Sequence, residues 1–166
     1  MRTFAQCLKF AAKLAMRSRL GRLLDDRTFI KLDMRLNGRK HFDIDRPETF
    51  SEKLQWLKLH DRRDEYTMMV DKLKVRDYIS STIGEEYLVP LIGAWDNPDD
   101  IDFASLPDKF VLKCNHNSGT GMCICKDKSS LDTEKVRRGL RKGLRQNYYD
   151  YCREWPYKNV ERKIIC

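Results

Sequence analysis

Long apolar runs are missing from this 166-residue sequence, in which 41% of residues are hydrophobic and 35% are charged. A membrane-spanning helix needs about 20 consecutive apolar residues, and no stretch of the chain approaches that length. The hydrophobic share still suffices for a core and argues against intrinsic disorder. A chain of this length forms one domain or a piece of a larger one.

Acidic residues are absent from the first 24 positions, which hold six Lys or Arg residues and carry most of the net charge of +8. Basic residues interrupt this block throughout, so it lacks the apolar core and cleavage site of a secretory signal. The six cysteines are therefore expected to be free thiols in a reducing cytoplasm. The rest of the chain is nearly balanced in charge, so no nucleic-acid partner is expected.

Residues 1–27 form the first of three predicted regions, a basic amphipathic N-terminal helix. Between residues 3 and 24, apolar side chains such as Leu8, Ala11 and Ala15 recur at helical spacing, with cations on the other side. Two interpretations stay open. The favoured one is a helix packed against the protein, and the alternative is peripheral contact of residues 1–24 with an anionic membrane surface.

Residues 28–107 are predicted to form a mainly helical N-terminal region. The letters TFSE at 49–52 are a capping box that begins a helix. The predicted core face of this helix consists of Phe50, Leu54 and Leu57. A further helix is expected over residues 67–82, and a short buried strand over residues 86–95.

The most informative stretch is DKFVLKCNHNSGTGMCICKDK. Two short apolar runs, 110–113 and 122–126, predict the strands of a hairpin with a polar tip. Gly119 and Gly121 allow positive φ and leave no Cβ between the backbone and a ligand. Successive amides in such a turn can hold an anion, and Lys113 at the end of the first strand adds a fixed positive charge. From the pattern alone, a plain glycine-tipped turn explains the stretch equally well.

The residue types of the same hairpin also raise two other kinds of site. Zinc could be held by Cys114, His116, Cys123 and Cys125, but their spacing is not that of a known zinc finger. Cys114 and His116 have the residue types of a nucleophile and a base, without an evident third group to orient them. A Walker A loop is excluded, because G-x4-G-K-[ST] does not occur in the chain.

A helix is expected to follow the hairpin, beginning near Asp132, with an apolar ridge on one side. Its opposite face is predicted to be solvated and consists of Arg137, Arg138, Arg141, Lys142 and Arg145. Residues 163–166 have the pattern of a strand that is just beginning. The sequence is therefore expected to stop within a domain.

The order of the segments resembles the TupA-like ATP-grasp family over about residues 28–165. The segments that carry the resemblance are RPETFSEKLQWLKLHDR, YTMMVDKLKVRDYISSTIGEEYLVPLIGAWDNPDDIDF, LPDKFVLKCNHNSG, ICKDKSSLD and NYYDYCREWPYKNVERKII. The resemblance implies an α+β fold, namely the N-terminal part of an ATP-grasp fold with N-terminal helices and a glycine-tipped β-hairpin. Residues 108–166 would be its nucleotide-binding subdomain, incomplete at the C-terminus.

The resemblance also implies ATP as the cofactor. Lys113 matches the family's strand lysine, which contacts the nucleotide phosphates, and Lys72 matches a second nucleotide-facing lysine. The loop that covers the phosphates corresponds to Ser118, Gly119, Thr120 and Gly121. The Mg²⁺ ligands are expected beyond residue 166, so no metal ligand or catalytic residue is assigned and the isolated chain is expected to be catalytically incompetent. Asn117 stands where relatives carry an acid.

Proteins of this family are encoded with capsule, teichuronopeptide and other surface-polysaccharide genes. The resemblance therefore implies part of a cytoplasmic ATP-dependent ligase or transferase, at the inner face of the membrane, with a sugar or polysaccharide-linked acceptor. One alternative is a non-catalytic module that binds anionic surfaces. Another is a glycosyltransferase, but the D-x-D letters of Asp43 and Asp45 lie in an ordinary loop before Pro47.

Overall fold

The computed structural model describes residues 4–39 and 41–166. It comprises two compact units, which are Met1–Arg63 with Tyr148–Lys158, and Asp64–Asn147 with Asn159–Cys166. Helices and a four-stranded antiparallel sheet confirm the α+β class. These two units are defined by which residues pack together. They do not test the three regions predicted from the sequence, 1–27, 28–107 and 108–166, which stay a prediction.

The first unit is helical. Its elements are α1 (Phe4–Met16), η1 (Arg19–Leu23), α2 (Asp26–Leu36), α3 (Phe50–His60), α7 (Tyr148–Cys152) and η5 (Trp155–Tyr157). The helix predicted over residues 3–24 thus ends at Met16, and its first residue lies outside the described part of the chain. No helix within residues 4–39 and 41–166 has the length and hydropathy needed to cross a membrane.

A buried arginine ties α7 to the N-terminal part of the first unit. Arg153 is only 2% exposed, and its guanidinium donates to the backbone oxygen of Gly21 at 2.6 Å. Its Nε lies 3.2 Å from the Asp26 carboxylate, and its Cζ lies 4.2 Å from the centre of the Phe29 ring. The buried positive charge therefore has both an anion and an aromatic face beside it.

Helix α3 begins as predicted, because the side chains of Thr49 and Glu52 form the capping box. The prediction that its apolar face is buried was wrong, since Phe50, Leu54 and Leu57 are 76%, 42% and 40% exposed. Helical spacing places such residues on one face but does not say what covers that face.

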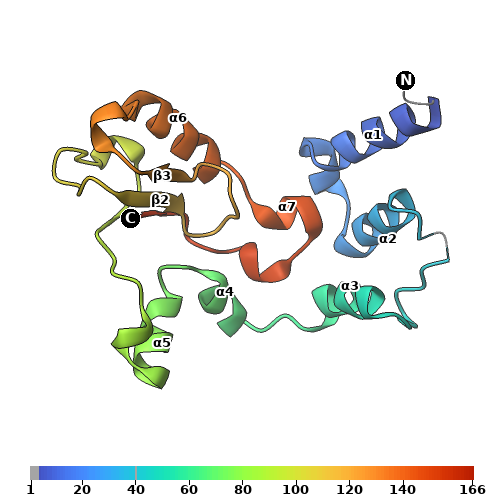
Figure 1. Ribbon diagram of the computed structural model, residues 1–166. Helices are drawn as coiled ribbons and strands as arrows, with labels where there is room; N and C mark the ends of the chain where they lie inside the picture. The colour runs from blue at the N-terminus through green and yellow to red at the C-terminus, as the bar shows by residue number, and fades with distance from the viewer. Residues whose placement is uncertain (1–3, 40) are drawn as a thin grey trace. The chain divides into compact units, whose positions relative to one another are not determined.

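The second unit contains the sheet. Its elements are α4 (Glu65–Val70), α5 (Val75–Ile83), η2 (Glu85–Tyr87), β1 (Ala94–Trp95), η3 (Pro98–Asp100), β2 (Phe110–Cys114), β3 (Cys123–Cys125), η4 (Lys128–Ser130), α6 (Thr133–Leu144) and β4 (Ile164–Ile165). The strands lie in the order β1-β4-β2-β3, and α6 runs beside the β2–β3 hairpin (Figure 1). The predicted hairpin and following helix are confirmed, whereas the strand predicted over 86–95 is reduced to β1.

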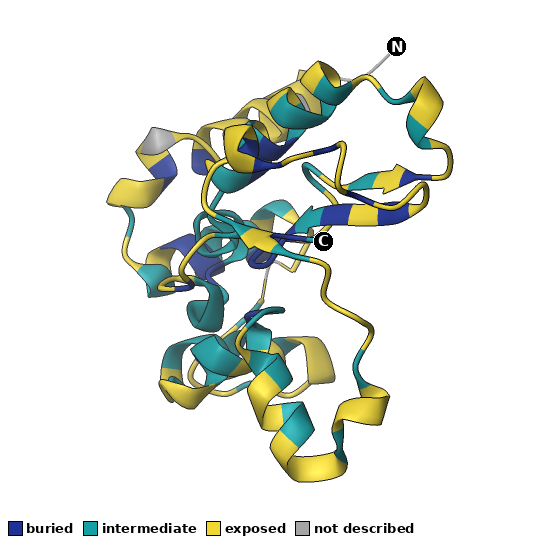
Figure 2. Ribbon diagram, turned by 90° about the vertical axis from the view of Figure 1, so that its left-hand side faces the viewer, coloured by how far each residue is buried: buried dark blue, intermediate teal, exposed yellow. Residues whose placement is uncertain are grey.

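The two faces of the sheet differ. Along β2, buried residues alternate with more exposed ones, as Figure 2 shows by colour. Phe110 and Leu112 join the main core of the unit with Leu140 of α6, whereas Val111 and Lys113 point to the opposite face because successive strand residues alternate. That second face is not covered by α6, and we call it the open face.

Helix α6 begins with the Asp132 side chain accepting the N–H of Lys135 at 2.9 Å. The expectation that its basic face is solvated was wrong at Arg137, whose side chain is only 18% exposed. The Arg137 guanidinium donates to the backbone oxygen of Ile101 at 3.1 Å and lies 5.0 Å from the centre of the Phe103 ring. A run of basic residues predicts a solvated face, but arginine can also pack against apolar groups through the stem of its side chain.

Candidate functional site

Asn115, directly after β2, joins the hairpin to two other segments of the second unit. It is fully buried, at 0% exposure. Its side-chain oxygen accepts the N–H of Lys163 at 2.8 Å, and its side-chain nitrogen donates to the Asp71 carboxylate and the Glu161 backbone oxygen, both at 2.8 Å. A buried amide needs such partners. These contacts hold the turn after α4 and the start of β4 against the end of β2.

Asp71 explains why the helix predicted over residues 67–82 is broken into α4 and α5. Its buried carboxylate accepts the backbone N–H of Leu73 at 2.9 Å and that of Lys74 at 3.3 Å. An aspartate that binds the amides two and three residues ahead competes with continued helix and starts a new one. The resulting turn places Lys72 next to the hairpin.

Lys72 contacts the hairpin loop and lines the same pocket as Lys113. Its Nζ donates to the backbone oxygen of Asn115 at 3.0 Å and to that of Asn117 at 2.8 Å. Burial lowers the pKa of the Lys72 ammonium, and the positive charge of Lys113 lowers it further. The structure therefore brings together the two lysines selected from the sequence, although they lie on different elements.

The loop tip carries the other four selected residues. Ser118 and Gly119 are exposed, and Thr120 and Gly121 are half-buried. The φ angles of Gly119 and Gly121 are 86° and 77°, so both residues adopt the positive φ that glycine allows. A Cβ on Gly119 would meet nothing within 4 Å, so the backbone at this position is open to a ligand.

The loop is docked on α6 through contacts that sequence reasoning missed. The side-chain nitrogen of Asn117 donates to the backbone oxygens of Thr120 at 2.9 Å and Gly143 at 3.4 Å. A Cβ on Gly121 would lie 2.7 Å from the backbone oxygen of Gly139, and one on Gly143 would lie 2.8 Å from that of Thr120. Only glycine allows this approach. The sequence did contain one indication of this docking surface, because Gly139 and Gly143 are four residues apart and therefore lie on one face of the helix.

A pocket of about 590 Å³ lies against the open face, beside the two lysines. Its charged lining consists of Lys72, Arg76 and Lys113, and its apolar lining includes Ile79, Leu88, Leu91, Val111 and Ile165. Arg76 also donates to the backbone oxygen of Val89 at 2.9 Å, which ties α5 to the segment before β1. The pocket can therefore receive a ligand with an anionic end and a flat apolar end.

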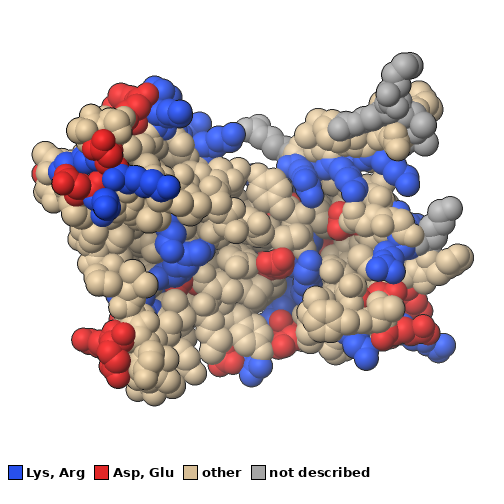
Figure 3. Space-filling model, viewed as in Figure 1, with Lys and Arg blue, Asp and Glu red and all other residues tan. Residues whose placement is uncertain are grey.

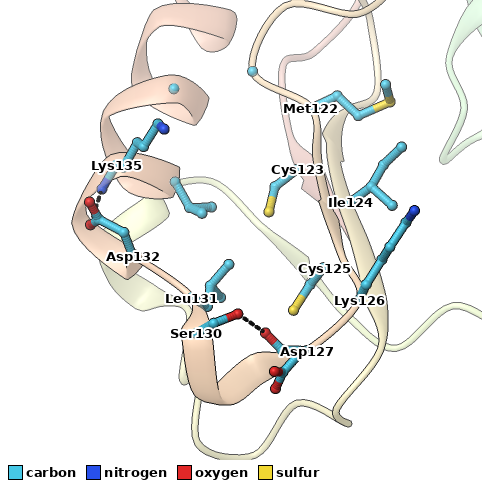
Figure 4. Close-up of a pocket in the computed structure, with 13 residues that line it drawn as sticks. Met122, Cys123, Ile124, Cys125, Lys126, Asp127, Ser130, Leu131, Asp132 and Lys135 are labelled. Carbon is cyan, nitrogen blue, oxygen red and sulfur yellow. Dashed lines mark hydrogen bonds between the residues drawn. The ribbon is translucent and has the colours of Figure 1, made fainter.

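A second pocket, of about 660 Å³, lies between β3, η4 and α6. Figure 4 shows Cys123 and Cys125 pointing into it, while Ile124 points away. Burial raises the pKa of the Cys123 thiol. Because the thiolate is the nucleophile and the metal ligand, a thiol that keeps its proton is poorly suited to either role.

The zinc and thiol-nucleophile interpretations of the hairpin lose their support. Burial raises the pKa of the Cys114 thiol to about 11. His116 is buried, and its Nε2 donates to the backbone oxygen of Gln146 at 2.9 Å. Within residues 4–39 and 41–166, no group of three or more His, Cys, Asp or Glu side chains is placed to hold a metal ion.

Comparison with known families adds independent evidence. A family model described as TupA-like ATPgrasp matches residues 52–166, more than half of the chain and all six selected site residues. No curated protein and no solved structure matches the chain. ATP-grasp proteins generally use ATP and Mg²⁺. The chain belongs to the TupA-like ATP-grasp family.

Proposed function

We propose that the pocket beside Lys72 and Lys113 binds ATP. The observation that carries this proposal is that two lysines from separate segments line one pocket together with Arg76. Lys72 also donates to the backbone oxygen of Asn117, which begins the loop with two positive-φ glycines. Burial first, and the positive charge of Lys113 second, disfavour the charged form of Lys72 and lower its pKa. A polyanion would reverse that penalty.

The residues of the pocket fit both ends of a nucleotide. Lys72 and Lys113 would hold the phosphates through charge-assisted hydrogen bonds, and the backbone of the loop from Ser118 to Gly121 would cover them. Val111 and Ile165 of the open face would contact the base, because apolar pockets favour flat rings. When bound, ATP would supply a transferable phosphoryl group.

The described residues do not fit Mg²⁺ in the same way. They include no cluster of carboxylates or imidazoles that could hold the ion, and the buried Asp71 carboxylate already accepts three N–H groups. No step is therefore assigned to a metal.

For the protein's wider role, we propose part of an ATP-dependent ligase or transferase of surface-polysaccharide biosynthesis. By family resemblance, ATP would phosphorylate a carboxylate to an acyl phosphate with release of ADP. An amine or similar nucleophile on a sugar or polysaccharide-linked acceptor would then attack the acyl carbon and displace inorganic phosphate. The place of action would be the cytoplasmic face of the membrane. Family membership supports these statements.

The test of the ATP proposal is calorimetric titration of the full chain with ATP. Lys113→Ala should weaken binding about 10-fold or more, because a hydrogen bond to a charged group contributes about 1.5–3 kcal/mol. Lys109→Ala is the matched control, since Lys109 is exposed and does not line the pocket. Equal affinities of the Lys113→Ala and Lys109→Ala variants, or no ATP binding by the parent chain, would refute the proposal.

A second candidate function is peripheral contact with an anionic membrane through residues 1–24. The apolar side of α1 faces outward, with Phe4, Leu8 and Leu14 at 85%, 64% and 63% exposure. Figure 3 shows Lys and Arg along one side of α1 and uncharged side chains on the other. This pattern argues against the packed helix favoured from the sequence, and together with the absence of acids it suits a helix lying in an anionic lipid interface.

Vesicle co-sedimentation tests this contact. The double variant Leu8→Ser/Leu14→Ser should bind anionic phosphatidylglycerol vesicles at least about 30-fold less well, since each buried leucine contributes on the order of 1 kcal/mol or more. Phe50→Ser is the control, because Phe50 is equally exposed but lies on α3. If both variants sediment like the parent chain, α1 is not the contact surface.

A further inference from the structure

We infer that Lys72 is a positioning residue that couples occupancy of the pocket to docking of the 115–121 loop on α6. The inference rests on the proposed function, because it takes the pocket's ligand to be ATP or a similar polyanion. The inference adds a second role for Lys72. Besides binding the anionic ligand, Lys72 binds the 115–121 loop.

The first step is the number of donors on the Lys72 side chain. An ammonium group has three N–H donors. Two are directed at the loop, to the backbone oxygens of Asn115 at 3.0 Å and Asn117 at 2.8 Å. Lys72 also lines the pocket, so its third donor can reach a phosphate there. One side chain therefore connects the pocket with the loop.

The second step is the path from Lys72 to α6. Asn117 is 4% exposed, and while its backbone oxygen accepts from Lys72, its side chain donates to the backbone oxygens of Thr120 and Gly143. Asn117 thus contacts both the lysine and Gly143 on the glycine face of the helix. A stronger or weaker hydrogen bond from Lys72 to Asn117 should therefore raise or lower the stability of the docked loop.

The third step is the effect of charge. Burial and the neighbouring Lys113 disfavour the positive charge of Lys72 in the pocket. A polyanion would favour that charge, and hydrogen bonds from a charged donor are about twice as strong as neutral ones. Ligand binding should therefore tighten the loop, and by thermodynamic reciprocity the docked loop should raise ligand affinity by the same factor.

Lys113 provides the matched comparison within the chain. It lines the same pocket, but among the described residues no hydrogen bond joins its side chain to the loop. Removing Lys113 should weaken the ligand without loosening the ligand-free loop. Removing Lys72 should do both.

Amide hydrogen exchange of the full chain, with and without ATP, tests the inference. ATP should slow exchange of residues 115–122 several-fold in the parent chain. It should do the same in Lys113→Ala, provided that the ATP concentration is raised until this weaker-binding variant is saturated. In Lys72→Ala the ligand-free loop should exchange faster, and saturating ATP should not slow it. Exchange of α6 amides reports whether each variant remains folded.

Asn117→Ala is the second variant, because it loosens the loop without removing a pocket residue. It should speed loop exchange and weaken ATP binding by one common factor, expected to be about 5-fold for a coupling of about 1 kcal/mol. Inorganic tripolyphosphate, which has the charge without the base, should protect the parent loop as ATP does.

The outcomes separate the inference from the proposed function. If neither ATP nor tripolyphosphate binds the parent chain, the proposed function fails. If ATP binds and the loop of Lys72→Ala responds as in the parent chain, only the coupling is wrong. Equal loop exchange in ligand-free Lys72→Ala and Lys113→Ala would also overturn it.

Discussion

Replacing Gly143 with alanine should destabilise the second unit, although alanine is the better helix former. A Cβ at this position would lie 2.8 Å from both the Cys114 sulfur and the Thr120 backbone oxygen. Real Cβ atoms essentially never approach other atoms so closely, so the sheet or the loop must shift. Overpacking of this kind costs about 1–3 kcal/mol, whereas helix propensity offers at most about 1 kcal/mol in return.

Gly139→Ala is the control in the same helix. A Cβ there would meet only the Cα of Gly121, at 4.0 Å, which is an ordinary contact. This variant should gain up to about 1 kcal/mol from helix propensity without a packing penalty. The two variants should therefore differ in free energy of unfolding by about 1–3 kcal/mol, or about 2–4 °C in melting temperature for each kcal/mol.

Urea unfolding and thermal melting, followed by circular dichroism, measure the difference. Amide exchange gives a second measurement, because Gly143→Ala should push Thr120 and Asn117 away from α6 and speed loop exchange. Equal stability and equal loop exchange in the two variants would show that the loop does not dock on α6 through Gly143.

Three further predictions concern other parts of the chain. Asp132→Ala removes the acceptor for the Lys135 N–H at the start of α6, so urea unfolding should show a loss of about 1 kcal/mol; an unchanged midpoint would contradict this. Arg153→Met removes the buried donor to the Gly21 backbone oxygen and one of two cations beside Asp26, since Arg62 remains. It should lower the stability of the first unit by about 1–3 kcal/mol, measured by thermal melting. ATP binding should weaken as pH rises through the alkaline range, because the lowered pKa of Lys72 makes it lose its proton before an ordinary lysine does. Bound phosphate should raise that pKa again, so calorimetry in buffers of different ionisation enthalpy should detect proton uptake, and none in Lys72→Ala.

Features that depend on nearby residues were predictable from the sequence. The strands of the hairpin alternate over a few positions, the positive φ angles of its loop fall on Gly119 and Gly121, and α6 begins at an aspartate cap. Each of these choices is decided within about one turn or one strand. The same reasoning was wrong for α3 and for Arg137, because the sequence pattern does not state which distant element covers a face.

The candidate site depends on contacts between segments that are distant in the sequence. The family resemblance pairs Lys72 with Lys113, whereas the local pattern around Asn115 predicts only the start of a polar turn. The Asn115 amide is buried, however, and a buried amide must find partners for both of its polar atoms. It finds them in Asp71 on one side and Lys163 on the other, and these contacts place Lys72 beside the loop. A polar residue directly after a buried strand is therefore worth testing as the link between segments, even where local pattern indicates only a turn.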